Sequence, residues 1–330
     1  MARRAPGLAV SGPRAAGVRT PYPEVPADVR AWVDATLGSP VVEAHEQVGG
    51  MSPGCATRVV CADGTRAFVK AVGADLNPDT PNLFRREVAV LELLGSHDLW
   101  ADLLASRDDG DWVALLLEDV EGTHPDFHDD ADLDAVLATT DRLAGVLGER
   151  VPDPGVWTSP VPLVSVNDRF AIWAETLATL DSAPEIAPVP VWLRADADRW
   201  TAVLTDLAAE PHRQLVHWDI RNDNLLRRPG GEIVVVDWGM AAIGPEWADP
   251  LLARLDRVDE AWFDSSIASS PAIVTAGGEA ITAWLIGFAT HLAVRSVTAV
   301  DVNLPTLNDF RRRESARMFV AAGRRTLSER

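Results

Sequence analysis

The chain has 330 residues, of which 47% are hydrophobic and 24% charged, the composition of a globular protein with a sizeable core. Its net charge of −19 argues against non-specific binding to nucleic acid or to an anionic membrane, because both require a basic surface. The two cysteines, Cys55 and Cys61, lack the spacing of a metal site, and so few thiols favour a reducing compartment such as the cytoplasm.

The first part of the chain combines an irregular arm with a β-rich region. Residues 1–24 are rich in Ala, Gly, Pro and Arg, show no periodicity and contain no apolar segment of a secretory signal, so we expect a flexible arm. Apolar residues at helical spacing, alternating apolar runs and Asp-Gly turns predict the elements that follow. Helices are expected over 26–38 and 83–96, and strands within 41–50, 56–62, 65–72 and 106–120.

The second half is predicted to be mostly helical. Segment 281–294, the most apolar, is too short to span a bilayer and favours a buried core helix. The order of the elements predicts an α+β fold with a small β-rich N-lobe over 25–120 and a larger helical C-lobe over 121–330. A short strand is expected over 232–238, and further helices over 131–150, 166–181, 191–209 and 307–327.

Two charged residues occupy apolar positions on neighbouring elements. Lys70 lies within the apolar strand pattern of 65–72, and Glu87 shares the apolar face of the helix 83–96. A buried ammonium or carboxylate group is costly without a partner, so we expect an ion pair between the two. Such a pair can hold a lysine toward a phosphate group, although a structural salt bridge or a lysine at a strand end would give the same pattern.

The segment HWDIRNDNLL, residues 217–226, places several polar side chains between apolar anchors. Asp219 and Asn224 lie in this loop, and Asp237 ends the apolar strand that follows it. Phosphoryl transfer needs a carboxylate that orients and deprotonates a hydroxyl group, and hard oxygen ligands for Mg²⁺, typically one carboxylate and one amide. These residues supply that set. Upstream, the glycines of 49–54 (GGMSPG) could bring backbone N–H groups to a phosphate, although a plain turn explains them as well.

With these motifs in this order, residues 41–255 resemble the aminoglycoside phosphotransferase family of the protein-kinase-like superfamily. The H-x-D-x-x-x-x-N core, followed by a strand and D-W, carries most of the resemblance. It implies a bilobal protein-kinase-like fold and an enzyme that transfers the γ-phosphate of ATP or GTP to an alcohol group. The supporting motifs are GGMSPG, FVK, RREVAVLELL, LLLEDV and VVVDWGMAAIGPEWADPLL.

The resemblance also implies a role for each matching residue. Asp219 would be the catalytic base, and Asn224 and Asp237 would bind Mg²⁺. His217 and Asp249 would brace the catalytic loop. The nucleotide would contact Lys70 with its partner Glu87, Ser52 in the glycine-containing loop, and the backbone of Glu118 and Val120 beside the purine.

The chain departs from the family pattern at positions that bear on specificity. Trp218 replaces the glycine often found beside the catalytic aspartate, and Gly239 stands where an acidic residue is common after D-W. A bulky indole next to Asp219 is expected to reshape the acceptor pocket. The glycine-containing loop is not standard either, which leaves ATP and GTP as alternatives. About nine residues separate Asp237 from the next expected helix near Glu246, too few for the activation segment of a protein kinase.

The acceptor is the least determined part of the prediction. Carboxylates within 255–266 could bind ammonium groups, although a solvated acidic face gives the same pattern. Tryptophans near the site could stack on a sugar or a base, although most tryptophans are core residues. Arg221 lies where protein kinases often place a lysine near the transferred phosphate. The candidate acceptor residues are Trp218, Arg221, Asp256, Asp259, Glu260 and Trp262.

We therefore predict a cytoplasmic small-molecule kinase, monomeric or homodimeric, that phosphorylates an antibiotic-like acceptor in resistance or self-resistance. The acceptor would be cationic, like an aminoglycoside, or nucleoside-like, and no nucleic-acid or membrane partner is expected. A metabolic kinase for a sugar, an amino alcohol or homoserine is the alternative. A nucleotide-binding pseudokinase is a third hypothesis, which the intact set of Lys70, Glu87, Asp219, Asn224 and Asp237 disfavours.

Overall fold

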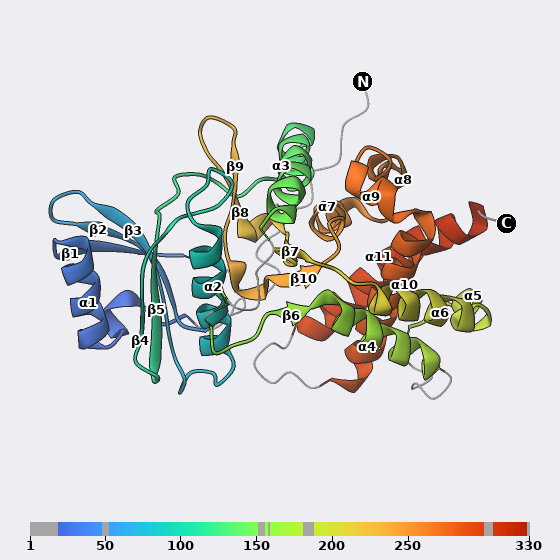
Figure 1. Ribbon diagram of the computed structural model, residues 1–330, viewed down its shortest axis with the longest axis horizontal. Coiled ribbons are helices and arrows are strands. Elements are labelled where there is room, and N and C mark those ends of the chain that lie inside the picture. Colours follow the sequence, from blue (N-terminus) through green and yellow to red (C-terminus); the bar gives the residue numbers. More distant parts are fainter. Residues whose placement is uncertain are drawn as a thin grey trace, which may run out of the picture.

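The computed structural model describes residues 19–47, 53–150, 156–157, 159–180, 188–299 and 306–328. Two regions of different architecture follow one another along the chain (Figure 1). The first is a five-stranded sheet with one helix on each face, and the second consists mostly of helices (Figure 1). The predicted α+β class is confirmed.

The N-terminal sheet has the strand order β1-β2-β3-β5-β4, and all neighbouring strands are antiparallel. The predicted Asp-Gly turns join β2 to β3 and β4 to β5, with positive φ at Gly64 and Gly110. The elements of this region are β1 Val41–Glu46, β2 Cys55–Cys61, β3 Arg66–Gly73, β4 Leu103–Asp108 and β5 Trp112–Leu117, with α1 Ala27–Leu37 and α2 Thr80–Leu94.

Alternation along β3 gives the sheet two different faces. Val69 packs with Val33 of α1, whereas Val72 packs with Leu94 of α2 in a second cluster. Lys70 has the same parity as Val72, so its side chain leaves the sheet on the α2 side. This position explains how a lysine within an apolar strand comes to face a helix.

The helix α2 begins at Thr80, earlier than the start expected at residue 83. The side-chain oxygen of Asn77 accepts hydrogen bonds from the N–H groups of Asp79 and Thr80. Pro81 then fits into the first turn, where no N–H donor is needed. The residues just before the predicted start therefore supply the first turn of the helix.

The end of the predicted arm is packed against the sheet. Thr20 donates its N–H to the carbonyl of Gly54 at 3.1 Å, and Tyr22, which begins a short 3₁₀ helix (Tyr22–Glu24), donates its N–H to Glu46 at 2.8 Å. Residues 1–18 lie outside the described residues. The described end of the arm, residues 19–24, is therefore held against the sheet.

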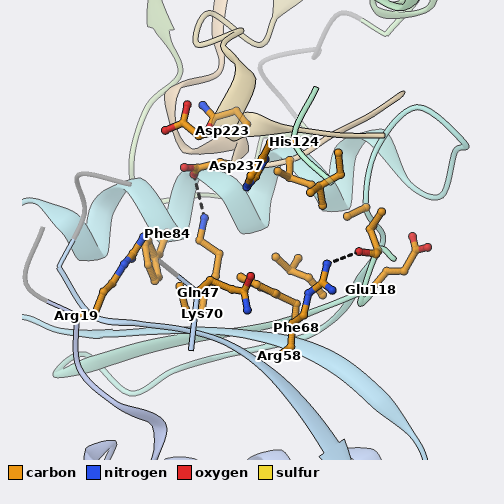
Figure 2. Close-up of a pocket in the computed structure, with 17 residues that line it drawn as sticks. Arg19, Gln47, Arg58, Phe68, Lys70, Phe84, Glu118, His124, Asp223 and Asp237 are labelled. Atoms are coloured by element: carbon orange, nitrogen blue, oxygen red, sulfur yellow. Dashed lines mark hydrogen bonds and ion pairs between the residues drawn. The ribbon is translucent and has the colours of Figure 1, made fainter. Parts of the chain in front are cut away.

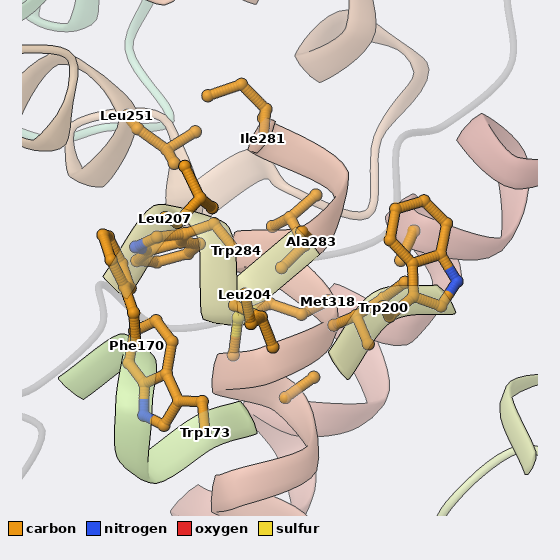
Figure 3. Packing of buried hydrophobic residues seen from close by; sticks show 14 of the residues in the cluster. Phe170, Trp173, Trp200, Leu204, Leu207, Leu251, Ile281, Ala283, Trp284 and Met318 are labelled. Carbon is orange, nitrogen blue, oxygen red and sulfur yellow. The ribbon is translucent and has the colours of Figure 1, made fainter. Parts of the chain in front are cut away.

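The second region packs around α10, the predicted core helix. Among the described residues it is the one helix long and apolar enough to cross a membrane, and 67% of its most apolar window is buried within the protein. It packs against α4, α6 and α11, with Trp173, Trp200 and Trp284 in the shared core (Figure 3). The helices are α3 Asp130–Gly148, α4 Val166–Ala178, α5 Val191–Ala195, α6 Ala197–Ala209, α7 Ala248–Leu252, α8 Ala261–Ile267, α9 Pro271–Ala276, α10 Gly278–Thr298 and α11 Leu307–Ser328.

Most helix predictions in this region are confirmed, with one difference. The helix expected over 191–209 is divided into α5 and α6 at Asp196, whose N–H closes a turn on the carbonyl of Leu193 at 3.1 Å. Short strands position the loop between the lobes. They are β6 Val164–Ser165, β7 Gln214–Val216, β8 Leu225–Arg227, β9 Ile233–Val235 and β10 Ala242–Gly244, in the sheets β6-β10-β7 and β8-β9.

Candidate active site

The predicted ion pair between Lys70 and Glu87 is present, and a second carboxylate joins it. Lys70 Nζ lies 2.5 Å from Glu87 Oε2 and 2.9 Å from Asp237 Oδ1. The ammonium group also lies 5.0 Å from the centre of the Phe84 ring. Glu87 is buried, and its other oxygen accepts the N–H of Trp238 at 3.3 Å. One lysine thus ties β3 to α2 and to the segment that follows β9.

The charges of this cluster shape one another. Burial alone would lower the pKa of Lys70, but the Asp237 and Glu87 carboxylates raise it above its usual value. Burial raises the pKa of Glu87 even though Lys70 opposes the shift. Burial also acts to raise the pKa of Asp237, but the Lys70 ammonium holds it below its usual value. At neutral pH the cluster therefore contains a charged lysine facing an ionised Asp237.

The side chain of Asn224 is hydrogen-bonded to Asp219, the residue predicted to be the catalytic base. Asn224 donates its side-chain N–H groups to the backbone oxygen of Asp219 at 2.9 Å and to Asp219 Oδ2 at 2.8 Å. The short 3₁₀ helix Asn222–Asn224 provides the bend, and Asn224 accepts the N–H of Val236 at 2.9 Å through its own carbonyl. These bonds connect the loop to the chain that leads into Asp237.

A buried carboxylate clamps the start of this loop. Asp249, on α7, accepts the N–H of His217 at 2.7 Å and that of Trp218 at 2.8 Å. His217 is fully buried, and its Nε2 lies 3.1 Å from the carbonyl of Val236. Trp218 has φ of 63° and Asp237 has φ of 68°, both in the region that favours glycine. The clamp accounts for how Trp218 keeps this conformation, and the bracing positions expected for His217 and Asp249 are both observed.

Asp219 is poised to accept a proton near neutral pH. Burial raises its pKa to about 6, with Arg221 opposing and Asp237 reinforcing the shift. Arg221 Nε lies 3.7 Å from Asp219 Oδ2 and 2.9 Å from Asp223 Oδ1, and the side chain is buried. Arg221 is therefore not a solvent-facing residue; it is a cation held between two carboxylates of the loop.

A cleft between the sheet and the second region brings most of the predicted nucleotide-site residues together. Figure 2 shows Lys70 rising from the sheet toward Asp237, with Arg19 and Glu118 on opposite sides of it. Ser52 lies outside the described residues. Gly54 does have positive φ, and a Cβ there would lie 2.5 Å from the carbonyl of Ala71, so only glycine fits. The lining residues are Arg19, Gln47, Ala56, Arg58, Phe68, Lys70, Phe84, Ala101, Leu117, Glu118, Val120, His124, Asp223, Asn224, Leu226, Val236 and Asp237.

Glu118 and Val120 border this cleft, on the segment that follows β5. The N–H of Val120 donates to the carbonyl of Glu118 at 3.1 Å, which places one backbone donor next to one backbone acceptor. The carbonyl of Val120 accepts a hydrogen bond of 2.6 Å from Arg58. A purine that used the Glu118 carbonyl and the Val120 N–H would replace their mutual bond.

The residues fit a magnesium ion that also binds a nucleotide. Among the described residues no group of three or more His, Cys, Asp or Glu side chains could hold a metal ion. Asp237 and Asn224 offer one carboxylate and one amide oxygen beside the same cleft, a partial set of the kind that Mg²⁺ completes with phosphate and water. The Asp237 side chain is 45% exposed, and Asn224 uses its amide nitrogen on Asp219, which leaves the amide oxygen for a metal.

The acidic residues expected to bind the acceptor make other contacts. Asp259 pairs with Arg317 of α11 at 2.9 Å, and the carbonyl of Asp256 accepts a hydrogen bond from the same guanidinium. The carbonyl of Glu260 accepts a hydrogen bond of 2.9 Å from Arg324. The guanidinium carbon of Arg257 lies over the Trp262 ring, 5.5 Å from the ring centre. The contacts of Arg317 and Arg324 fasten α11 to the chain around α8, and none of the four predicted residues lines the cleft.

Two features of the site escaped the sequence analysis. Lys70 is the only lysine among the 30 basic residues, and a chain that uses arginine everywhere else marks the one position where a compact ammonium is needed. Arg19 enters the cleft from the segment assigned to the flexible arm. Burial lowers the pKa of Arg19, and the Asp237 carboxylate opposes the shift. No local pattern identifies Arg19, because its position depends on pairing with Gly54.

Comparison with known proteins identifies the family. A sequence model of the phosphotransferase enzyme family, APH, matches residues 58–270, which is more than half of the chain and includes Lys70, Asp219 and Asp237. The chain belongs to the phosphotransferase enzyme family. This phosphotransferase has no match among curated protein sequences.

Solved structures show that the phosphotransferase has the kinase-like fold of its family. An aminoglycoside phosphotransferase from Alicyclobacillus acidocaldarius is similar with a TM-score of 0.57 and 14% identity, covering 87% of this chain and 92% of that one. The ternary complex of APH(2")-IIa with streptomycin and ATP is similar with a TM-score of 0.56 and 14% identity, covering 90% of this chain and 99% of that one. Choline kinase LicA from Streptococcus pneumoniae is similar with a TM-score of 0.54 and 12% identity, covering 89% of this chain and 98% of that one. The family and fold identify a small-molecule kinase; at these identities the acceptor stays open.

Proposed function

We propose that the phosphotransferase transfers the γ-phosphate of ATP or GTP to a hydroxyl group of a small molecule, with Mg²⁺ as cofactor. The observation that carries the proposal is the meeting of Lys70, Asp237, Asn224 and Asp219 from separate parts of the chain. Lys70 reaches Asp237 at 2.9 Å, and Asn224 reaches Asp219 at 2.8 Å. This set matches the positioning lysine, the metal-binding pair and the base that phosphoryl transfer requires.

Each residue then has a defined task. Lys70, held by Glu87, binds the α- and β-phosphates. Asp219 orients the acceptor hydroxyl group and takes its proton while the oxygen attacks the γ-phosphorus and the bond to the leaving diphosphate breaks. With a pKa of about 6, the Asp219 carboxyl is mostly ionised at neutral pH and can act in this way. Asp237 and Asn224 hold Mg²⁺, which when bound neutralises the charge of the phosphates.

The single lysine allows a direct test of the nucleotide site. An acyl phosphate derivative of ATP acylates amines beside the bound phosphates, and Lys70 is the only side-chain amine of the chain. Peptide mass spectrometry should find the acyl group on Lys70, with labelling suppressed by excess MgATP or MgGTP. The α-amino group is an internal control whose labelling should not respond. Labelling of Lys70 that neither nucleotide suppresses would contradict the proposal, and the stronger competitor reveals the preferred base.

We further propose two classes of acceptor. An antibiotic acceptor follows from the prediction above and from the likeness to the streptomycin complex of APH(2")-IIa. A metabolite acceptor is favoured by the ion pair between the Asp259 carboxylate and Arg317 of α11, which occupies a group expected to bind a cationic antibiotic. Resistance of a sensitive host that is lost in Asp219→Ala would support the first class. Transfer of labelled phosphate to a metabolite but to no antibiotic would support the second.

A further inference from the structure

A wall of aromatic rings joins the catalytic loop to the helices α4 and α10. Trp218, next to Asp219, stacks on Trp173 of α4 with ring centres 6.5 Å apart and an interplanar angle of 28°. Trp173 in turn stacks on Phe288 of α10, at 5.2 Å and 25°. The residues one helical turn away on α4 and α10 therefore lie close to the catalytic loop.

Those neighbouring positions are occupied by basic residues. Arg169 precedes Trp173 by one turn of α4, and His291 and Arg295 follow Phe288 by one and two turns of α10. Arg311 of α11, like Arg169 and Arg295, is close enough to His291 for its positive charge to lower the pKa of the imidazole. We call Arg169, His291, Arg295 and Arg311 the basic cluster.

The basic cluster continues toward the segment after Asp237. Arg169 is close enough to Arg86 of α2 for its positive charge to add to the effect of burial and lower the pKa of Arg86. The Arg86 guanidinium donates a hydrogen bond of 3.2 Å to the carbonyl of Gly239. Pairing of β6 with β10, with Ser165 opposite Ile243, places the first turn of α4 beside the same segment. The cluster thus lies on the side of Asp219 and Asp237 where α4 and α10 meet the loop, away from the sheet that carries Lys70.

No described carboxylate forms an ion pair with Arg169 or Arg295, although the chain as a whole is acidic. The sequence has 49 acidic and 30 basic residues, and the arginines of α11 that fasten the fold, Arg317 and Arg324, pair with Asp259 and Asp264. Among the described residues, the charged groups that influence the pKa of His291 are Arg295, Arg169 and Arg311, and Arg311 also donates a hydrogen bond of 2.7 Å to Asn308 Oδ1. Burial, reinforced by these arginines, lowers the pKa of His291 to about 4, so the imidazole stays neutral beside them.

We propose that the basic cluster binds an anionic group of the acceptor, so that the substrate is a hydroxyl compound bearing a carboxylate or a phosphate. This inference rests on the proposed function and favours an anionic acceptor over the cationic one expected from the sequence. Guanidinium groups bind both anions through charge-assisted hydrogen bonds. The aromatic wall gives the uncharged body of the acceptor a surface to lie on while its hydroxyl group reaches Asp219.

Acceptors matched in shape and different in charge test the proposal. Glucosamine, glucose, glucuronate and glucose 6-phosphate form one series, and serinol, glycerol, glycerate and glycerol 3-phosphate form a second. Release of nucleoside diphosphate should be fastest with the anionic members, and the carboxylate and phosphate arms distinguish the two anions. In Arg169→Gln/Arg295→Gln, KM for the best anionic acceptor should rise roughly tenfold, with kcat and the nucleotide KM nearly unchanged. Arg142→Gln, an exposed arginine of α3 paired with Asp98, is the control.

Preference for the cationic or neutral members, or an unchanged acceptor KM in the double variant, would overturn the proposal. A second measurement does not require turnover. Trp218 is partly exposed beside the cluster. The fluorescence of this tryptophan is obtained by subtracting the emission of Trp218→Phe from that of the wild type. At constant ionic strength, the ratio of iodide to caesium quenching of this component should exceed the ratio measured for free N-acetyltryptophanamide, and Arg169→Glu/Arg295→Glu should bring it below that reference. A ratio equal to the reference would also overturn the inference. Absence of transfer to every acceptor with iodide preference intact would count against the proposed function instead.

Discussion

Lys70 and Asp237 are 167 positions apart in the sequence, and their side chains meet at 2.9 Å across the cleft. Because Glu87 binds the same ammonium group, one lysine connects the sheet, the helix α2 and the segment that follows β9. The position of the nucleotide phosphates and the stability of the fold therefore depend on the same contact.

Replacing Lys70 should destabilise the fold as well as stop catalysis. Lys70→Met leaves Glu87 buried without its cation, and loss of one partner of a buried pair typically costs about 3–5 kcal/mol. Lys70→Met/Glu87→Leu removes the orphan charge and should recover much of the loss. Urea unfolding followed by fluorescence gives both values, and a double variant no more stable than Lys70→Met would show that Glu87 does not depend on the pair.

The rate of transfer should fall with acidity through the titration of Asp219. Its pKa of about 6 predicts that kcat/KM decreases below about pH 6, because the protonated carboxyl cannot accept the hydroxyl proton. Asp249 also has a pKa of about 6, raised by burial. Both folded-state values lie above the unfolded value of 3.8, so the folded protein binds more protons between about pH 4 and 6.

The stability that these two carboxyls contribute thus increases as pH falls through this window, and acid unfolding through them does not explain a lost rate. Initial-rate assays from pH 5 to 8, with the melting temperature measured at each pH, separate protonation of the base from loss of the folded protein. A rate that stays constant down to pH 5 would contradict the assignment of Asp219 as the base.

The backbone of Trp218 should carry measurable strain. Its φ of 63° suits glycine, so Trp218→Gly should be more stable than Trp218→Ala by about 1 kcal/mol, although both lose the stacking on Trp173. Ile172, 40% exposed within α4, is the control, because there the alanine variant should be the more stable one. If alanine is favoured at both positions, the positive φ is not retained in solution.

Arg19 should contribute to binding of the nucleotide phosphates. The ammonium group of Lys70 is already paired with two carboxylates. Arg19 is a further cation of the same cleft, and it lies close enough to Asp237 for that carboxylate to raise its pKa against the effect of burial. Arg19→Ala should weaken ATP roughly tenfold and leave adenosine unaffected, because adenosine lacks the phosphates. Isothermal titration measures both ligands, with Arg142→Ala as control. Equal losses for ATP and adenosine would indicate a structural effect on the cleft.

The parts predicted from the sequence are those set by local patterns. The period of β3 and α2 was sufficient to pair Lys70 with Glu87, and the order of motifs predicted the loop that carries Asp219 and Asn224. The sequence could not place Arg19, whose position follows from pairing with Gly54, or separate Asp259 from the acceptor site, because its partner Arg317 is on a distant helix. The basic cluster escaped for the same reason, since Arg169, Arg295 and Arg311 come together only after three helices pack.

The central claim is that Asp219 serves the transfer step and not nucleotide binding. The most direct measurement compares wild type with Asp219→Asn in acceptor-dependent transfer of labelled phosphate and in calorimetric binding of Mg²⁺-nucleotide. The account predicts a loss of about 10²–10⁴-fold in transfer with the nucleotide dissociation constant nearly unchanged. Undiminished transfer in Asp219→Asn, or a loss explained entirely by weaker nucleotide binding, would contradict it.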